Sequence, residues 1–103
     1  MDYLVDFTLT VPAGTPASEL ERRTTGEGTR VAELAAQGHA LRVWRPVPDD
    51  GRSRAIGLYR AADDSELQAI LESLPLRPWM ELSVTALAEH PNDPALSSSG
   101  SRP

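Results

Sequence analysis

One carboxylate near the start of the chain lies where the sequence pattern predicts an apolar side chain. Residues spaced three and four apart within segment 19–38 share one face of a predicted helix: Leu20, Thr24, Glu27, Val31 and Leu34. Glu27 lies in the middle of this stripe, so its carboxylate is either turned aside to water or held in a half-dry pocket. Burial in a pocket raises the pKa of a carboxyl group, which suits a proton-transfer residue. The flanking Gly26 and Gly28 favour the plainer interpretation of a distorted or loosely packed helix.

The rest of the sequence predicts the elements that must hold this helix. Alternating apolar and polar residues indicate strands over 3–10, 40–45, 55–60 and 81–87. A second helix follows residue 63, with an apolar stripe formed by Leu67, Ile70, Leu71 and Leu74. The order β-α-β-β-α-β is the ferredoxin-like α+β pattern, a four-stranded antiparallel sheet with helices on one face. The other face would be left bare, which favours self-association into a dimer of the α+β barrel type or a larger ring.

The ends of both helices are predicted from short local signals. Thr15 followed by Pro16 indicates an N-cap with proline at the first helical position, and Gly38 indicates the carboxyl-terminal stop. Asp63 and Glu66, three residues apart, resemble a capping box for the second helix. The pair Arg22-Arg23 is interpreted as part of a solvated helix face.

Composition excludes several classes of chemistry. The chain has 103 residues, no cysteine and two histidines far apart, so neither a disulfide nor a metal site is expected. All ten basic residues are arginine, which excludes a lysine Schiff base, and the net charge of −5 argues against nucleic acid. Without a long apolar run or a basic leader, we expect a cytoplasmic protein that does not bind a membrane. Residues 1–90 should form one domain, and 91–103 have the composition of a flexible tail.

Several stretches in order resemble the muconolactone Δ-isomerase family. They are TLTVP in the first strand, GEGTRVAELAAQG before the second, VWRP, LPLRPWM and HPND. The spacing matches without gaps from Met1 to Arg45, needs about three extra residues in the loop 49–53, and then continues through Pro91.

The resemblance implies a ferredoxin-like subunit, an obligate homo-oligomer (a ring of ten in characterised members) and no cofactor. The implied reaction shifts the ring double bond of a butenolide, from muconolactone to the enol-lactone of 3-oxoadipate in aromatic catabolism. Glu27 falls on the family's glutamate, Trp44 and Arg45 on its tryptophan and arginine, and His90 on its histidine before proline. The chain departs from the family at Arg42, which replaces a histidine, and at 53–55, where Ser-Arg-Ala replaces Tyr-Ala-Asn.

The isomerisation would need a base, a donor for the enolate oxygen and a group that holds the substrate. Glu27 would be the base. Arg42 and Trp44 share one face of the second strand, with Leu41, Val43 and Arg45 on the other. Either Arg42 or Trp44 could supply the donor, and Arg45 could clamp a substrate carboxylate, or each could have a packing or ion-pair role instead. Further candidate substrate contacts, for which packing is the alternative, are Tyr59, Trp79 and His90.

The sequence therefore predicts a divergent, cofactor-free isomerase of this family that acts on a small lactone or related carbonyl compound. An isomerase or cyclase for a larger, polyketide-like substrate is an alternative, as is a non-catalytic binding or assembly protein.

Overall fold

The computed structural model describes residues 1–47 and 53–97. Its elements are, in order, β1 (Asp2–Leu9), α1 (Ala17–Ala36), β2 (Ala40–Trp44), β3 (Ser53–Arg60), α2 (Asp64–Glu72), the 3-10 turn η1 (Arg77–Trp79), β4 (Met80–Leu87) and α3 (Pro94–Ser97). The four strands and the helices α1 and α2 confirm the predicted β-α-β-β-α-β order. The flexible tail predicted from residue 91 includes α3 and continues past residue 97, outside the described residues.

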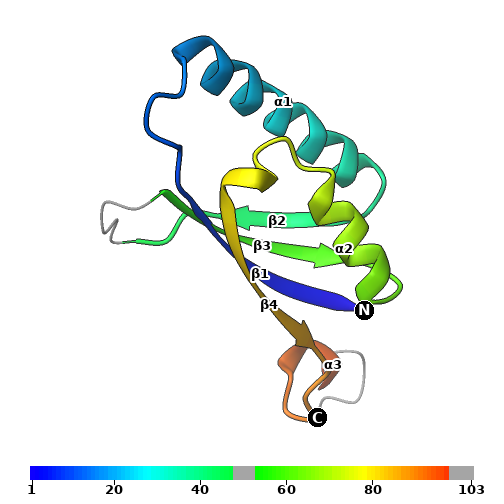
Figure 1. The fold of residues 1–103 in the computed structure, drawn as a ribbon. Helices are drawn as coiled ribbons and strands as arrows, with labels where there is room; N and C mark the ends of the chain where they lie inside the picture. Colours follow the sequence, from blue (N-terminus) through cyan, green and yellow to red (C-terminus); the bar gives the residue numbers. More distant parts are fainter. Residues whose placement is uncertain (48–52, 98–103) are drawn as a thin grey trace.

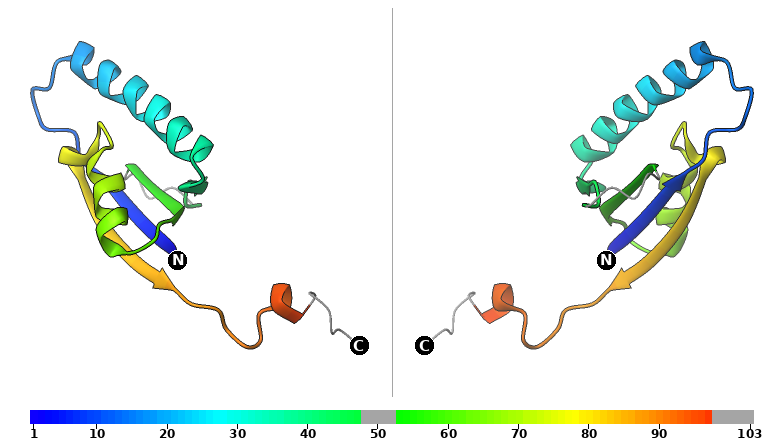
Figure 2. Two further views of the ribbon diagram at one scale, coloured as in Figure 1. Left: turned by 90° about the vertical axis from the view of Figure 1, so that its right-hand side faces the viewer. Right: turned by 90° about the vertical axis from the view of Figure 1, so that its left-hand side faces the viewer.

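The sheet is antiparallel with the strand order β2-β3-β1-β4. Both long helices lie on one of its faces, and the chain beyond β4 leads away from the body of the molecule (Figures 1 and 2). The opposite face has no covering layer within the described residues. This is the arrangement predicted from the sequence.

The core lies between the sheet and the two helices. The alternation in β1 turns Tyr3, Val5 and Phe7 toward the helices, where all three are buried. They pack with Leu34 of α1 and with the apolar stripe of α2, in which Leu67, Ile70, Leu71 and Leu74 are all buried. The core therefore forms because alternate residues of β1 pack against the apolar stripes of the two helices.

α1 ends as predicted but begins differently. Gly38 has φ +84°, a conformation that glycine adopts without a steric penalty. The N–H of His39 donates to Leu34 O at 2.8 Å and that of Gly38 to Ala35 O at 3.0 Å, which together form a Schellman motif. At the amino end the cap is Pro16, and the Thr15 hydroxyl donates to Pro12 O at 2.6 Å instead of capping the helix. The predicted Thr15 cap is therefore wrong.

The capping box of α2 is confirmed. The Glu66 N–H donates to Asp63 Oδ1 at 2.9 Å, and the Glu66 carboxylate accepts from the Ala62 N–H at 2.7 Å. The reciprocal bond reaches one residue further back than in the common motif, and it fixes the entry of the chain into α2.

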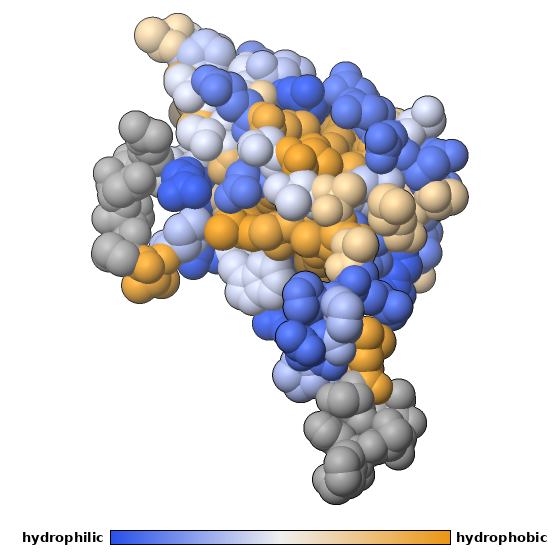
Figure 3. Space-filling model, turned by 90° about the horizontal axis from the view of Figure 1, so that it is seen from below, coloured by the Kyte–Doolittle hydropathy of each residue, from blue (hydrophilic) through white to orange (hydrophobic). Residues whose placement is uncertain are grey.

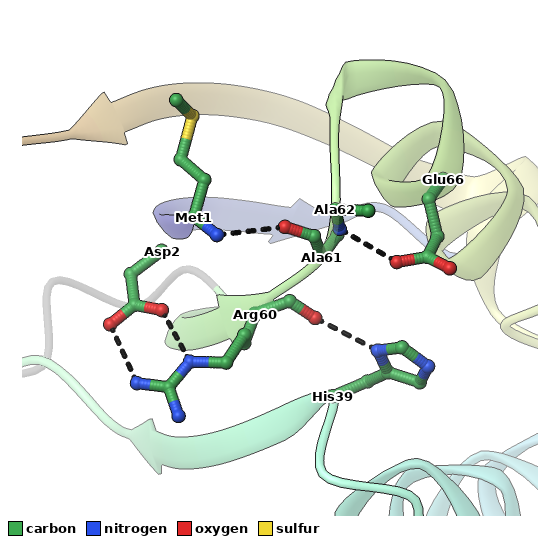
Figure 4. A network of polar contacts seen from close by, with 7 residues as sticks. All are labelled: Met1, Asp2, His39, Arg60, Ala61, Ala62 and Glu66. Carbon is green, nitrogen blue, oxygen red and sulfur yellow. Dashed lines mark hydrogen bonds and ion pairs between the residues drawn. The ribbon is translucent and has the colours of Figure 1, made fainter.

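A polar network closes one end of the sheet (Figure 4). Arg60 forms two hydrogen bonds with Asp2, at 2.8 and 3.1 Å, and its carbonyl oxygen accepts from His39 Nδ1 at 2.8 Å. The amino-terminal ammonium of Met1 donates to Ala61 O at 2.9 Å. His39, which directly precedes β2, thereby joins this strand to the end of β3. This end of the sheet is the one away from the cavity described below.

The uncovered face is apolar in its middle. The register places Leu4, Ile56 and Leu58 on this face, where they are half-buried within one chain. Figure 3, which shows the molecule from the side opposite α1, has hydrophobic residues gathered in the centre with hydrophilic residues around them. Asp6 and Arg54 form an ion pair of 3.7 Å near this patch.

Candidate active site

A cavity of about 540 Å³ lies between α1 and the sheet. It forms because α1 diverges from the sheet toward its amino end: Leu34 is fully buried, Val31 and Glu27 are half-buried, and Thr24 is exposed (Figure 2). The apolar part of the wall comes from β1, α1 and the segment around η1, through Phe7, Leu9, Val31, Leu76 and Met80. The polar side chains in the wall include Glu27, Arg45, Ser53 and Tyr59.

Glu27 lies in the wall of this cavity, half-buried rather than turned to water. Its Oε1 accepts a hydrogen bond of 2.9 Å from the backbone N–H of Leu76. Burial raises the pKa of Glu27 above its ordinary value of 4.5, and the Leu76 hydrogen bond partly opposes that rise. A carboxylate with one oxygen held and a raised pKa is suited to take and return a proton.

Tyr59 contributes a phenol to the same cavity from β3. The residue is 1 % exposed, and its ring lies over Gly57, where an added Cβ would be 2.6 Å from Tyr59 Cε1. Burial and the nearby charge of Glu27 raise the pKa of Tyr59 to about 12. No hydrogen-bond partner of its hydroxyl occurs among the described residues. The hydroxyl therefore stays protonated and free to donate to a ligand.

Arg45 reaches the cavity because of a bulge in β2. Ala40 pairs with Tyr59 and Arg42 with Leu58, so one extra residue, Leu41, is inserted between them. After the bulge, Val43 and Arg45 line the cavity, whereas Arg42 is on the uncovered face. Arg45 is exposed and has no ion pair with a carboxylate of the described residues.

The other predicted site residues do not line the cavity of this chain. Arg42 and Trp44 lie together on the uncovered face, with the Arg42 guanidinium 5.1 Å from the centre of the Trp44 ring. Trp79 stacks with Arg23 of α1 at 4.8 Å, and His90 is exposed beyond β4, where its Nδ1 accepts from the Asn92 N–H at 3.0 Å. Within one chain the structure therefore brings together Glu27, Arg45 and Tyr59.

Two parts of the site were not predicted from the sequence. The backbone N–H of Leu76 is the partner of the Glu27 carboxylate, and no sequence signal identifies a particular backbone donor 49 residues away. Arg23, interpreted as part of a solvated face, is instead half-buried and donates from Nη1 to Pro75 O at 2.7 Å. Its position four residues before Glu27, on the same side of the helix, was the available signal.

Metal-binding and membrane-spanning features are not found in the described part of the chain. No group of three or more histidine or acidic side chains there could hold a metal ion. No helix within residues 1–47 and 53–97 has the length and apolar character needed to cross a membrane.

Comparisons with known proteins agree on one family. The family model for muconolactone delta-isomerase matches residues 1–93. Muconolactone Delta-isomerases from Acinetobacter baylyi and Cupriavidus pinatubonensis are each 29% identical over 92 residues, which is 89% of this chain and 93% and 97% of theirs. A crystal structure of muconolactone isomerase matches with a TM-score of 0.80 at 21% identity, covering 91% of this chain and 95% of that one. The family match spans both long helices and all four strands of the sheet.

Proposed function

The chain belongs to the muconolactone delta-isomerase family, and from this premise we propose that it is a cofactor-independent isomerase that shifts the ring double bond of a butenolide lactone. The observation that carries the proposal is Glu27, a carboxylate with a raised pKa in the wall of a largely apolar cavity. Muconolactone is the first substrate to test, because the relatives that match the chain are named for it.

Glu27 performs both proton transfers in this proposal. The carboxylate removes a proton from a ring carbon next to the carbonyl system, which gives a dienolate, and the resulting acid returns the proton one allylic position away. One carboxyl group can do both when bulk water is kept from the intermediate. The bond from Leu76 to Oε1 leaves Oε2 as the oxygen that accepts the proton.

Tyr59 and Arg45 bind the substrate. The Tyr59 hydroxyl donates to the lactone oxygen on which the negative charge develops, the role first assigned to Arg42 or Trp44. A pKa of about 12 keeps that proton in place at neutral pH. Arg45 lines the cavity as a cation without a carboxylate partner among the described residues, which fits a substrate that carries its own carboxylate.

A second candidate function is the isomerisation of a substrate bulkier than muconolactone, and the small side chain of Ser53 supports it. Ser53 lines the cavity at the position where the resembling family has a tyrosine, so a large side chain is replaced by a small one. The space gained there would accommodate a substituted lactone, a related enone or a larger polyketide-like ring. The replacement of the family's histidine by Arg42 affects the uncovered face rather than the wall of this cavity.

We also propose that the protein is a homo-oligomer in which a second copy covers the bare face of the sheet. The half-buried Leu4, Ile56 and Leu58 support this arrangement, since they leave apolar area exposed to water in a single chain.

The proposal is tested by hydrogen exchange in D₂O followed by NMR. Muconolactone and butenolides with larger ring substituents are incubated with the protein, with Glu27→Gln and with Glu33→Gln. Glu33 is a matched control, because it lies on the same helix but pairs at the surface with Arg30 at 3.1 Å. We expect deuterium at the ring carbons with the parent and with Glu33→Gln, and at least a hundredfold slower incorporation with Glu27→Gln. Equal incorporation by Glu27→Gln and the parent would remove Glu27 as the base.

A further inference from the structure

We propose that Arg23 is a positioning residue for Glu27, and that it acts through the single peptide unit that joins Pro75 to Leu76. This inference rests on the proposed function of Glu27 as the base, and it assigns the residue that regulates that base.

Both polar ends of one peptide unit are held by α1. The carbonyl oxygen of Pro75 accepts from Arg23 Nη1 at 2.7 Å, and the N–H of Leu76 donates to Glu27 Oε1 at 2.9 Å. These two groups belong to the same planar amide, because the carbonyl of Pro75 is bonded to the nitrogen of Leu76. Arg23 and Glu27 are four residues apart, so one turn of α1 spans the peptide unit.

Arg23 is itself fixed by two further contacts. Its Nε lies 3.1 Å from Glu19 Oε2, one turn earlier on α1, and its guanidinium stacks with the Trp79 ring at 4.8 Å. The guanidinium is thus held on several sides, with the side chain 26% exposed. Trp79, which the sequence suggested as a substrate contact, supports Arg23 instead.

The two hydrogen bonds that link Arg23 to Glu27 through the Pro75–Leu76 peptide form a relay, and this relay has a direct electrostatic consequence at Glu27. A cation that donates to an amide oxygen polarises the amide, which makes its N–H a stronger donor. The Leu76 N–H then stabilises the ionised form of Glu27 more strongly and opposes the effect of burial on its pKa. The same bond directs Oε1 toward η1 and leaves Oε2 for the substrate. Arg23 therefore helps to set both the protonation and the orientation of the base.

Other charged groups face Glu27 and bear on the test. Tyr59 of β3 and Arg45 after β2 line the cavity, and Arg54 of β3 also contributes to the wall while it pairs with Asp6. All of them are unchanged by a substitution at Arg23, so a difference between the parent and that variant reports the loss of Arg23, and the control below separates its contact with the peptide from its charge alone.

The test is a direct measurement of the Glu27 pKa by ¹³C NMR of its carboxyl carbon, without any substrate. The signal is identified by its absence in Glu27→Gln. In Arg23→Met we expect the pKa of Glu27 to rise by about half a unit, because the Leu76 N–H is no longer polarised by a cation at the Pro75 carbonyl. The acid limb of the pH–rate profile should move by the same amount in the same direction.

Arg30→Met is the matched control. Arg30 is also on α1 and also reaches across to the α2 side, where its Nε donates to Ser73 Oγ at 2.9 Å, but its contact does not involve the Pro75–Leu76 peptide. We expect no shift of the Glu27 pKa in Arg30→Met. Arg23→Lys keeps the positive charge but loses the planar guanidinium with its several N–H donors. It should shift the Glu27 pKa less than Arg23→Met does, and it provides a second measurement if Arg23→Met does not fold.

An unchanged Glu27 pKa in Arg23→Met, or in Arg23→Lys where Arg23→Met does not fold, would overturn the relay and reduce Arg23 to a tie between α1 and the following loop. So would an equal shift in Arg30→Met. Failure of the proposed function gives a different result, since the NMR shift would persist while Glu27→Gln retained full activity.

Discussion

Removing the Tyr59 hydroxyl gives a quantitative test of whether the folded chain shields this group from water and so raises its pKa. The pKa of Tyr59 rises from 10.0 to about 12 on folding, so above pH 10 the unfolded chain loses this proton while the folded chain keeps it. The free energy of unfolding therefore falls as pH rises from 10 to 12, by about 1 kcal/mol per pH unit, and changes little below pH 9. Tyr59→Phe has no such group and lacks this part of the slope.

The expected magnitude follows from the two pKa values. Between pH 9 and pH 11 the difference in unfolding free energy, parent minus Tyr59→Phe, should fall by about 1.3 kcal/mol. Urea denaturation followed by circular dichroism at pH 9, 10 and 11, at one protein concentration, measures this difference. Val5→Ala is the control, since it destabilises the same core without removing a titrating group, and its difference from the parent should not depend on pH. A constant difference for Tyr59→Phe would show that the hydroxyl ionises as freely in the folded chain as in the unfolded one, and would refute its role as a dry donor.

Three further substitutions test the rest of the site and the assembly. Burial raises the pKa of Glu27 above 4.5, so its contribution to stability falls as pH rises past that value; in urea titrations Glu27→Gln should be more stable, relative to the parent, at pH 8 than at pH 4. Gly57→Ala places a Cβ 2.6 Å from the Tyr59 ring, which must shift, so we expect a loss of about 1–3 kcal/mol in stability and of tenfold or more in kcat/KM; unchanged turnover would contradict the placement of Tyr59. Leu58→Glu puts a charge on the uncovered sheet face and should dissociate the oligomer in sedimentation velocity; an oligomer of unchanged mass would count against that face as the interface.

The fold was predictable from the sequence because its signals are local and periodic. The alternation in β1 and the helical stripe of α2 each specify one buried face, and the capping box at Asp63 specifies where α2 begins. Thr15 was the exception, because its hydroxyl found a nearer partner in the carbonyl of Pro12.

The candidate site was predictable in part. Glu27 could be identified because a carboxylate in an apolar stripe is a local anomaly of one helix. The faces of Arg42 and Arg45 were also assigned correctly relative to each other, since the bulge at Leu41 precedes both of them. Which face meets the cavity could not be predicted, because that depends on the pairing of β2 with β3.

Contacts between distant segments were not predictable. Trp79 was interpreted from the sequence as a candidate substrate contact, with packing as the alternative. Its stacking with Arg23 joins segments that are 56 positions apart in the chain, and no periodic pattern encodes such a contact. The packing of the Tyr59 ring over Gly57 was likewise not predictable, because it depends on Gly57 having no side chain.

The extra residue in β2 has a consequence for how this protein can change. Because side chains alternate along a strand, regular pairing of Leu41 with Leu58, without the bulge, would exchange the two faces of everything from Arg42 to the end of the strand, whereas deletion of Leu41 would leave those faces as they are. With the regular pairing, Val43 and Arg45 would leave the cavity, and Arg42 and Trp44 would enter it, with no substitution in any of the four. Loss of the bulge with every residue retained would thus replace an aliphatic and cationic wall by an aromatic and cationic one, and such a step would be invisible to a comparison that scores residue identity alone.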